Sequence, residues 1–174
     1  MIDHTPYMQR AIVLAKLGTK AVRSNPKVGS ILVHKNRIIG EGYHKKYGDA
    51  HAEVNCIESV RKKDQHLIAQ SRIYITLEPC YHRGKTPPCV DLIIKNNIKE
   101  VIIGITDPNP KVSGQSIAKL RCTGISVVEG ICKEECHNLI RPFIKLMNQN
   151  SPWVHLKFAK SKFNYMAAKE GQVW

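Results

Sequence analysis

The sequence predicts an α/β protein, a three-layer α/β/α sandwich built around a mixed β-sheet. Three observations predict this fold. Two apolar strand patterns close together form a hairpin early in the chain, and helical and strand patterns then alternate as far as residue 147. The 174 residues are 43% hydrophobic with only 11 Gly and 9 Pro, so one domain can bury a core without disulfides.

The first predicted elements are a helix and the hairpin. The helix covers residues 5–21, because Thr5 can cap it and Pro6 suits its first turn. Two strands follow at 28–33 and 38–42, with a short turn between them. Since that turn is too short for a crossover, the two strands are expected to pair antiparallel.

The rest of the chain alternates between helices and strands. A second helix begins after Asp49, its predicted cap. The elements predicted after it are a strand at 72–77, a helix opened by Pro87 and Pro88, a strand at 100–105, a turn at 107–110, a helix at 115–121, a strand at 125–128 and a last helix reaching Met147. Pro142 falls inside that last helix and predicts a kink or a break there.

The C-terminal residues show a separate pattern. Val154, Leu156 and Phe158 alternate with polar residues, which is typical of a strand. A single strand has no partner of its own in this part of the chain. We therefore expect residues 1–150 to form one domain and residues 151–174 to be the opening of a second, missing domain. An exposed strand of this kind also leaves self-association into a homo-oligomer open.

Charge and composition restrict the partners and the compartment. The chain has 27 Lys and Arg against 14 Asp and Glu, a net charge of +13, which favours phosphates on a small substrate or nucleic acid. Its basic runs lack interleaved aromatic residues and are more typical of solvated faces, so nucleic acid is the less expected partner. The sequence has no secretory signal pattern and no apolar run of membrane-spanning length, so we expect a cytoplasmic protein without a membrane partner.

Three short motifs carry chemistry. His51 begins a predicted helix, Cys80 follows a predicted strand, and Cys89 begins the next predicted helix. One imidazole and two thiolates are the three protein ligands of a catalytic zinc that keeps its fourth position for water. The sequence therefore predicts one Zn²⁺ per chain, bound by His51, Cys80 and Cys89.

Glu53 is the predicted catalytic residue. It lies two positions after His51, where it can reach a metal-bound water without binding the metal, and so it can move protons. Zinc lowers the pKa of such a water toward neutrality, and helix N-termini favour ionised thiolates. The alternative is a non-catalytic, zinc-stabilised binding module, although a structural zinc normally fills its fourth position with another protein ligand.

The other four cysteines have a simpler interpretation. Cys56 and Cys122 are predicted to be core thiols. Cys132 and Cys136 with His137 could form a second metal cluster, but Cys136 belongs to the apolar stripe of the last helix. We expect that stripe, and not a metal, to explain Cys136.

Five stretches of the sequence carry a family resemblance. They are SNPKVG at 24–29, GYH at 42–44, HAEVN at 51–55, TLEPCYHRGKTPPC at 76–89 and DPNPKV at 107–112. In this order they resemble the cytidine-deaminase superfamily and, within it, the deaminase half of the bifunctional riboflavin biosynthesis family RibD. Eight residues separate Cys80 from Cys89. Cytidine and tRNA adenosine deaminases usually have two residues between their two cysteines, so the longer spacing here favours the RibD family.

The resemblance implies a fold, a reaction and further site residues. The fold is the cytidine-deaminase-like sandwich. The reaction is hydrolytic deamination of 2,5-diamino-6-(5-phosphoribosylamino)pyrimidin-4(3H)-one to 5-amino-6-(5-phosphoribosylamino)uracil, so the implied partner is a phosphoribosyl-pyrimidine. Matching positions imply that Asn25 and His44 contact the pyrimidine or ribose, and that His82, Lys85 and Asn109 hold the ribose-phosphate end.

Two further expectations follow from the resemblance. Residues 152–159 resemble the first strand of the family's reductase domain, but the Leu-Asp-Gly that usually follows the serine is absent after Ser161. We therefore expect no reductase activity, and NADPH only if the missing reductase domain were present. The alternative enzyme is a nucleic-acid deaminase acting on tRNA adenosine or on cytidine, which the net charge of +13 favours and the cysteine spacing disfavours.

Overall fold

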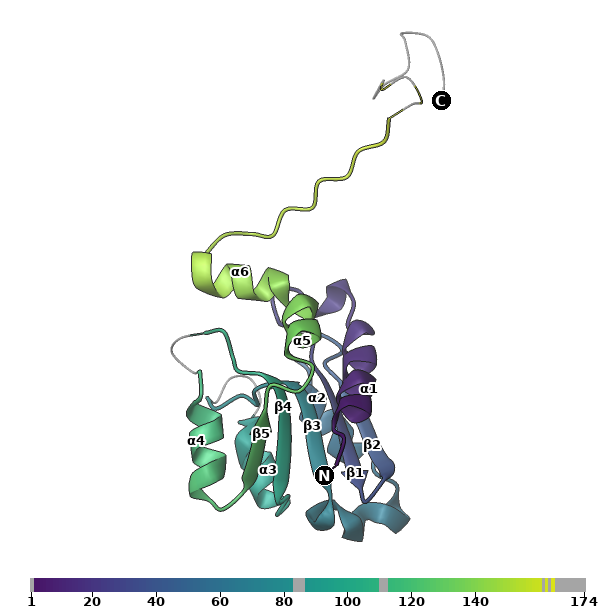
Figure 1. The fold of residues 1–174 in the computed structure, drawn as a ribbon, viewed down its shortest axis with the longest axis vertical. Helices are drawn as coiled ribbons and strands as arrows, with labels where there is room; N and C mark the ends of the chain where they lie inside the picture. Colours follow the sequence, from purple (N-terminus) through teal and green to yellow (C-terminus); the bar gives the residue numbers. More distant parts are fainter. Residues whose placement is uncertain (1, 83–86, 110–112, 161, 163, 165–174) are drawn as a thin grey trace.

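A five-stranded sheet forms the centre of the protein in a computed structural model, which describes residues 2–82, 87–109, 113–160, 162 and 164 (Figure 1). The strands β1 (Gly29–His34), β2 (Arg37–Tyr43), β3 (Arg72–Leu77), β4 (Glu100–Ile105) and β5 (Ser126–Glu129) lie in the order β2-β1-β3-β4-β5. β1 pairs antiparallel with β2 and β3, whereas β3–β4 and β4–β5 are parallel pairs. The predicted mixed sheet and its antiparallel hairpin are confirmed.

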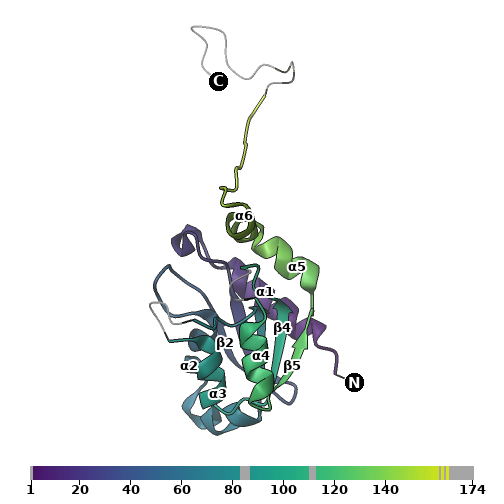
Figure 2. The same cartoon turned by 90° about the vertical axis from the view of Figure 1, so that its left-hand side faces the viewer.

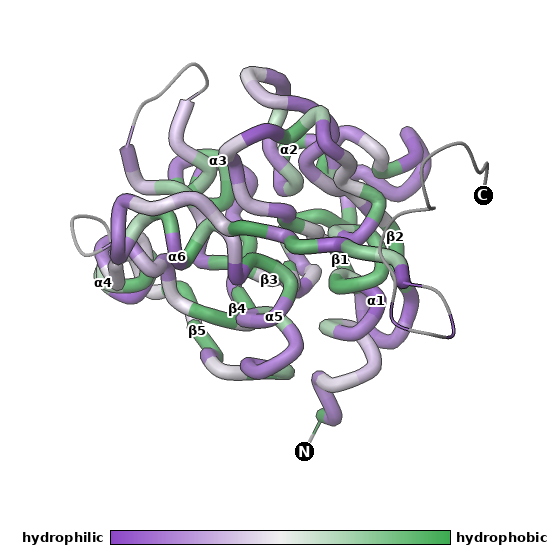
Figure 3. Tube along the Cα trace, turned by 90° about the horizontal axis from the view of Figure 1, so that it is seen from above, coloured by the Kyte–Doolittle hydropathy of each residue, from purple (hydrophilic) through white to green (hydrophobic). Residues whose placement is uncertain are grey.

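Helices cover both faces of this sheet. The elements are α1 (Thr5–Lys16), α2 (Ala52–Glu58), α3 (Cys89–Lys95), α4 (Gln115–Cys122), α5 (Lys133–Leu139), α6 (Arg141–Gln149) and the 3₁₀ helices η1 (Lys20–Val22) and η2 (Lys62–Gln70). Seen from above, α2 and α3 lie on one side of the strands and α1 and α5 on the other (Figure 3). The three predicted layers are therefore confirmed. In the described part of the chain, no helix combines the length and apolarity needed to cross a membrane.

The core divides into two clusters, one on each face of the sheet. Ile73 and Ile75 of β3 belong to the cluster that includes residues of α2, α3 and α4. Tyr74, between them in sequence, belongs to the cluster with Met8 of α1 and Cys136 of α5. Successive strand residues point to opposite faces, so one apolar strand supplies both cores.

The first helix is shorter than the sequence predicts. α1 ends at Lys16, not near residue 21, and the chain then forms η1. The helix is interrupted because Thr19 caps a new turn: its side chain accepts a hydrogen bond from the Ala21 N–H at the start of η1. The predicted cap at Thr5 is wrong: its own backbone N–H donates to Asp3 Oδ1 at 2.9 Å.

Two other helix boundaries test the sequence analysis. Asp49 is not the cap of α2, because His51 occupies the N-cap position with extended backbone angles. The break at Pro142 is confirmed, since α5 ends at Leu139 and α6 begins at Arg141. Proline is tolerated in the first turn of α6 because an N–H there would lack a helical partner.

Gly42 sets the distance between β2 and α2. A Cβ at this position would lie 2.3 Å from the Cys56 backbone nitrogen and 2.6 Å from the Ala52 carbonyl oxygen. Only glycine allows so close an approach without a shift of the backbone. The strand can therefore lie directly against the helix whose first turn carries the chemistry.

The segment after α6 differs from the rest of the chain. Residues 151–160 belong to no helix or strand, and they lead away from the sheet (Figures 1 and 2). Val154, Leu156 and Phe158 are 72%, 86% and 65% exposed. The alternating pattern there is present, but the strand it predicts is not formed, because a strand requires a hydrogen-bonded neighbour.

Candidate metal centre and its pocket

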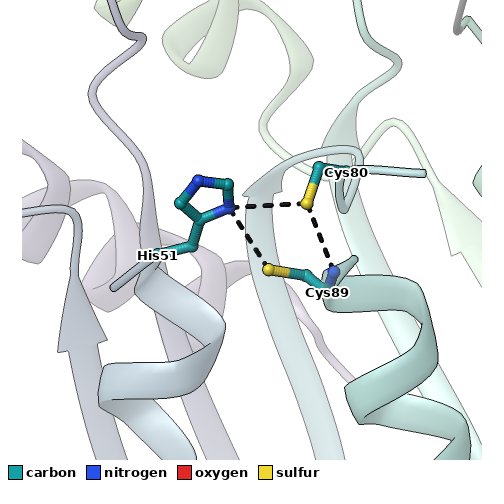
Figure 4. A group of neighbouring side chains, drawn as sticks. All are labelled: His51, Cys80 and Cys89. Carbon is teal, nitrogen blue, oxygen red and sulfur yellow. Dashed lines mark hydrogen bonds between the residues drawn. The ribbon is translucent and has the colours of Figure 1, made fainter. Parts of the chain in front are cut away.

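Three side chains from distant parts of the sequence meet beyond the carboxyl end of β3. His51 precedes α2, Cys80 follows β3, and Cys89 is the first residue of α3. Figure 4 shows the imidazole and the two thiols pointing toward one another from these three segments. Loops at the carboxyl ends of parallel strands are the usual place for a site in an open α/β sheet.

The distances between the donor atoms suit a tetrahedral metal ion. His51 Nδ1 lies 3.4 Å from Cys80 Sγ and 3.3 Å from Cys89 Sγ. Zinc–nitrogen bonds of about 2.0–2.1 Å and zinc–sulfur bonds of about 2.3 Å require an N···S separation of about 3.6 Å in a tetrahedron. All three donor atoms lie within 4.8 Å of one another, and among the described residues no other group has this arrangement. The donor set therefore fits three ligands of one zinc ion.

The electrostatics of the two thiols also favour a cation. Hydrogen bonds from the Cys89 side chain, from His51 and from the Cys89 backbone N–H lower the pKa of Cys80. The hydrogen bond to Cys80 also raises the pKa of His51. The pKa of Cys89 is raised because its thiol donates to Cys80 and is buried. A metal ion would supply the positive charge that lets the second thiol ionise as well.

Glu53 lies in the first turn of α2, two residues from His51, and its side chain is buried. Burial raises its pKa to about 7, and the negative charge of Cys80 contributes in the same direction. A carboxyl group with a pKa near neutrality can both accept and release a proton at physiological pH. Glu53 therefore has the position and the proton affinity of a general acid and base.

A cavity of about 430 Å³ opens at this site, which is the size of a small-molecule pocket. Its lining comes from the loop before β1, the loop between β2 and α2, the start of α2, the loops after β3 and β4, and α6. The lining residues with functional side chains are Asn25, His44, Tyr47, Asp49, His51, Glu53, Glu78, Cys80, His82, Asp107 and Asn109, together with Phe143 and Met147.

His44 is held in one orientation within the pocket wall. Its Nδ1 lies 3.2 Å from the Ala50 carbonyl oxygen, and its Nε2 lies 3.1 Å from Asn25 Nδ2. A carbonyl oxygen only accepts, so Nδ1 carries the proton and Nε2 accepts from the amide of Asn25. Burial lowers the pKa of His44, which keeps the ring neutral, and the ring meets His51 edge-on at a centroid distance of 5.5 Å.

The structure brings most of the predicted site residues together. Asn25, His44, His82 and Asn109 line the same cavity as the metal-binding group and Glu53. Lys85 lies outside the described residues.

Several pocket residues were given no site role from the sequence, among them Glu78, Asp107, Phe143 and Met147. Glu78 and Asp107 belong to motifs that carry the family resemblance, so the signal for them was present. In the sequence, Phe143 and Met147 of α6 are recognisable only as members of an apolar stripe. Periodicity cannot tell a helix face that packs on a core from one that closes a pocket.

The remaining cysteines are partly as predicted. Cys56 is fully buried, and burial raises the pKa of its thiol to about 12. Cys136 is buried in the core beside α1, as its place on the apolar stripe indicates. Cys122 is exposed, so its assignment to the core is wrong. It is the last residue of α4, and the buried face of that helix consists of Ser116, Ile117 and Leu120.

Comparison with known proteins gives a consistent result. Residues 1–105 match the model of the cytidine and deoxycytidylate deaminase zinc-binding region. The chain is 49% identical over 146 residues to the diaminohydroxyphosphoribosylamino-pyrimidine deaminase of Buchnera aphidicola subsp. Schizaphis graminum, covering 84% of this chain and 97% of that protein. It is 42% identical over 166 residues to the riboflavin biosynthesis protein RibD of Actinobacillus pleuropneumoniae, covering 95% of this chain and 43% of that protein.

A solved structure adds the fold. The deaminase/reductase of Thermotoga maritima aligns with a TM-score of 0.85 and 48% identity over 92% of this chain and 45% of its own. The chain thus spans nearly all of the Buchnera deaminase but less than half of the RibD and deaminase/reductase relatives. With its sequence, its fold and its metal-binding group in agreement, the chain belongs to the zinc-binding cytidine and deoxycytidylate deaminase family, in the branch of the diaminohydroxyphosphoribosylaminopyrimidine deaminases.

Proposed function

We propose that this protein hydrolyses 2,5-diamino-6-(5-phosphoribosylamino)pyrimidin-4(3H)-one to 5-amino-6-(5-phosphoribosylamino)uracil and ammonia, a step of riboflavin biosynthesis. The observation that carries the proposal is the convergence of His51, Cys80 and Cys89 at a pocket that buried Glu53 also lines. The deaminase from Buchnera, matched over nearly its full length, supports the choice of substrate.

The reaction exchanges an amine for a water oxygen at the ring carbon between the two pyrimidine nitrogens. When bound by His51, Cys80 and Cys89, zinc would act as a Lewis acid at the water that attacks this carbon. The Glu53 carboxylate takes a proton from that water and delivers it to the adjacent ring nitrogen. Glu53 then takes the proton of the newly added hydroxyl group and passes it to the exocyclic amine, so the carbon–nitrogen bond breaks, a carbonyl forms and ammonia leaves. Glu53 is buried in the first turn of α2, two residues after His51, which places its carboxyl group beside the metal-binding group for both transfers.

The other pocket residues would orient the substrate. Asn25 and the neutral ring of His44 form a linked pair at one side of the cavity and present polar groups to the base or ribose. Asn109 and His82 lie on the loops after β4 and β3, and we assign them to the ribose-phosphate end. The net charge of +13 favours a phosphorylated ligand of this kind.

Ammonia release tests the proposed function directly. Zinc-loaded protein is incubated with the phosphoribosylated diaminopyrimidinone, with deoxycytidine monophosphate and with tRNA at equal concentrations. We expect ammonia from the first compound alone. Deamination of tRNA with no turnover of the small pyrimidine would contradict the proposal and favour a nucleic-acid deaminase.

We further propose that residues 151–174 correspond to the beginning of a reductase domain. RibD from Actinobacillus matches 95% of this chain but continues well beyond the match. The exposed apolar side chains at 154, 156 and 158 suit a strand awaiting neighbours. A cytoplasmic location is part of the same proposal, because thiolates that bind zinc must remain reduced.

A further inference from the structure

Glu78 is a buried carboxylate for which the proposed chemistry has no use. It follows the last residue of β3 and lies two residues before Cys80. Its relative exposure is 4%, and its backbone N–H continues the sheet by donating to the Ile105 carbonyl oxygen at 2.9 Å. Burying a carboxylate is costly unless hydrogen bonds replace its water.

Among the described residues, four hydrogen bonds replace that water, and their donors lie between β4 and the first turn of α4. Oε2 accepts from the backbone N–H groups of Asp107 at 3.0 Å and Gly114 at 2.9 Å. Oε1 accepts from the backbone N–H of Ser116 at 3.1 Å and from its hydroxyl at 2.7 Å. Each oxygen thus receives two donors, an arrangement that only a carboxylate with both oxygens accepting can satisfy.

Two of these bonds cap α4 from outside the helix. Its N-cap residue is Gly114, which has a φ of 78° and no side chain to offer. The first N–H groups of a helix need an acceptor, and a negative charge there is favourable. Glu78 therefore supplies from β3 the cap that α4 cannot supply itself.

The other end of the same network reaches the pocket. The backbone N–H of Asp107 donates to Glu78. The Asp107 side chain in turn accepts a hydrogen bond from the Asn109 N–H at 2.8 Å. Glu78, Asp107 and Asn109 all line the cavity at the metal centre. One carboxylate thus links the strand that leads to Cys80 with the loop that carries Asn109.

We propose that Glu78 is a positioning residue that fixes the loop after β4 against the metal centre and thereby sets the affinity for substrate. The inference rests on the proposed function, because it assigns that loop to the ribose-phosphate end of the substrate. A contact remote from the reacting carbon contributes equally in the ground state and the transition state, so its loss raises KM and leaves kcat nearly unchanged. If Glu78 only capped α4, its substitution would lower the stability of the protein without raising KM selectively over kcat.

The variant Glu78→Gln tests this, since glutamine keeps the size of the side chain but has only one accepting oxygen. The matched control is Glu100→Gln, the same substitution near the other end of the same strand pair, where Glu100 pairs with Arg72. We expect Glu78→Gln to raise KM by about 10-fold to 100-fold, the range for lost hydrogen bonds to a charged group. Bound zinc and kcat should stay near the wild-type values, and Glu100→Gln should change none of these quantities.

Ser116→Ala refines the result, because it removes the hydroxyl donor and leaves the three backbone donors in place. We expect an increase in KM smaller than that of Glu78→Gln. Equal KM values for Glu78→Gln and Glu100→Gln would overturn the proposal, and so would a loss of kcat with no change of KM. If Glu78→Gln fails to fold, Ser116→Ala alone decides, and an unchanged KM overturns the inference.

Hydrogen exchange separates this inference from the proposed function. Without substrate, the amides of Asp107, Gly114 and Ser116 should exchange at least about tenfold faster in Glu78→Gln than in the wild type, while Glu100→Gln leaves them protected. If the wild type releases no ammonia from the pyrimidine, the proposed function fails, yet this exchange still tests the loop. Unchanged exchange at all three amides would overturn the positioning role even in an active enzyme.

Discussion

The two ends of the central strands carry charged groups in opposite environments. At the carboxyl end of β3 and β4, Glu53 and Glu78 are 3% and 4% exposed and lie beside the metal-binding group. At the other end, Arg37 pairs with Asp64, and the Arg37 side chain is 56% exposed. Asp64 is itself only 7% exposed, but its charge is paired with an arginine side chain that stays in contact with water, which neither glutamate has among the described residues.

This difference separates side chains with a role in the proposed reaction from side chains that only stabilise the fold. Burial raises the pKa of Glu53 to about 7, which is a property of the pocket and not of the glutamate itself. Exposed ion pairs are screened by water and contribute little. Substitutions at the carboxyl end should therefore affect metal binding and turnover, whereas substitutions at the opposite end should affect stability alone.

The largest effect is expected from Cys80→Ser and Cys89→Ser. A hydroxyl is a poor replacement for a thiolate ligand, so zinc affinity should fall by more than the 10-fold to 100-fold that loss of an outer partner costs. Turnover should then be lost, as measured by zinc content after dialysis and by ammonia release. Cys122→Ser, at an exposed position, is the control. Full zinc retention in both pocket variants would remove these residues from the ligand set.

Glu53→Gln should separate turnover from metal binding at the same end of the sheet. The amide cannot accept a proton, so kcat should fall by about 10²-fold to 10⁴-fold while zinc content and fold are kept. Glu58→Gln, on the exposed side of the same helix, should retain activity. A kcat within a few fold of the wild type would show that Glu53 is not the proton carrier.

Two glycine substitutions extend the comparison to the backbone. Gly42→Ala crowds the start of α2 and should cost about 1–3 kcal/mol of unfolding free energy and weaken zinc binding. Gly124→Ala, before β5 at the opposite end, meets no atom within 4 Å but has a φ of +78°. It should cost about 1–2 kcal/mol through backbone strain and leave zinc binding unchanged. Urea unfolding and zinc titration of both variants measure the two effects, and equal zinc affinities would contradict the proposed role of Gly42.

The smallest effect is expected from Asp64→Asn at the far end. A hydrogen bond from Arg37 lowers the pKa of Asp64 in the folded state. The stabilisation it brings is therefore present above the ordinary aspartate pKa of about 4 and is lost as the pH falls through the lower folded value. Thermal unfolding of wild type and variant should differ slightly at pH 7, and the difference should vanish in acid. If the difference in thermal stability between wild type and variant grew in acid, the Arg37–Asp64 pair would not be its cause.

Helix ends show how far sequence patterns reach. The strand boundaries were predicted closely because short, continuous apolar runs bounded by turn residues are a local property of the sequence. The caps at Thr5 and Asp49 were wrong, because a cap depends on local angles that several nearby polar residues can provide. Residues 154–158 show the same limit for strands, since the pattern was present but a partner strand was not.

The metal-binding residues were predicted from residue type and order alone. His51, Cys80 and Cys89 follow or precede elements that the sequence defines well, so their convergence at the carboxyl ends of the strands could be expected. Phe143 and Met147 could not be assigned to the pocket in the same way. Where α6 lies depends on the break at Pro142 and on what the helix then contacts.

The sequence by itself determined the layers of the fold and which residues are candidates for metal binding and proton transfer, because these depend on periodicity and on side-chain chemistry. Only the tertiary structure decided the surroundings that give them their properties. Burial raises the pKa of Glu53, and the four hydrogen bonds on Glu78 join residues 29 to 38 positions apart in the sequence. Such contacts arise from packing between elements, which one-dimensional patterns do not encode.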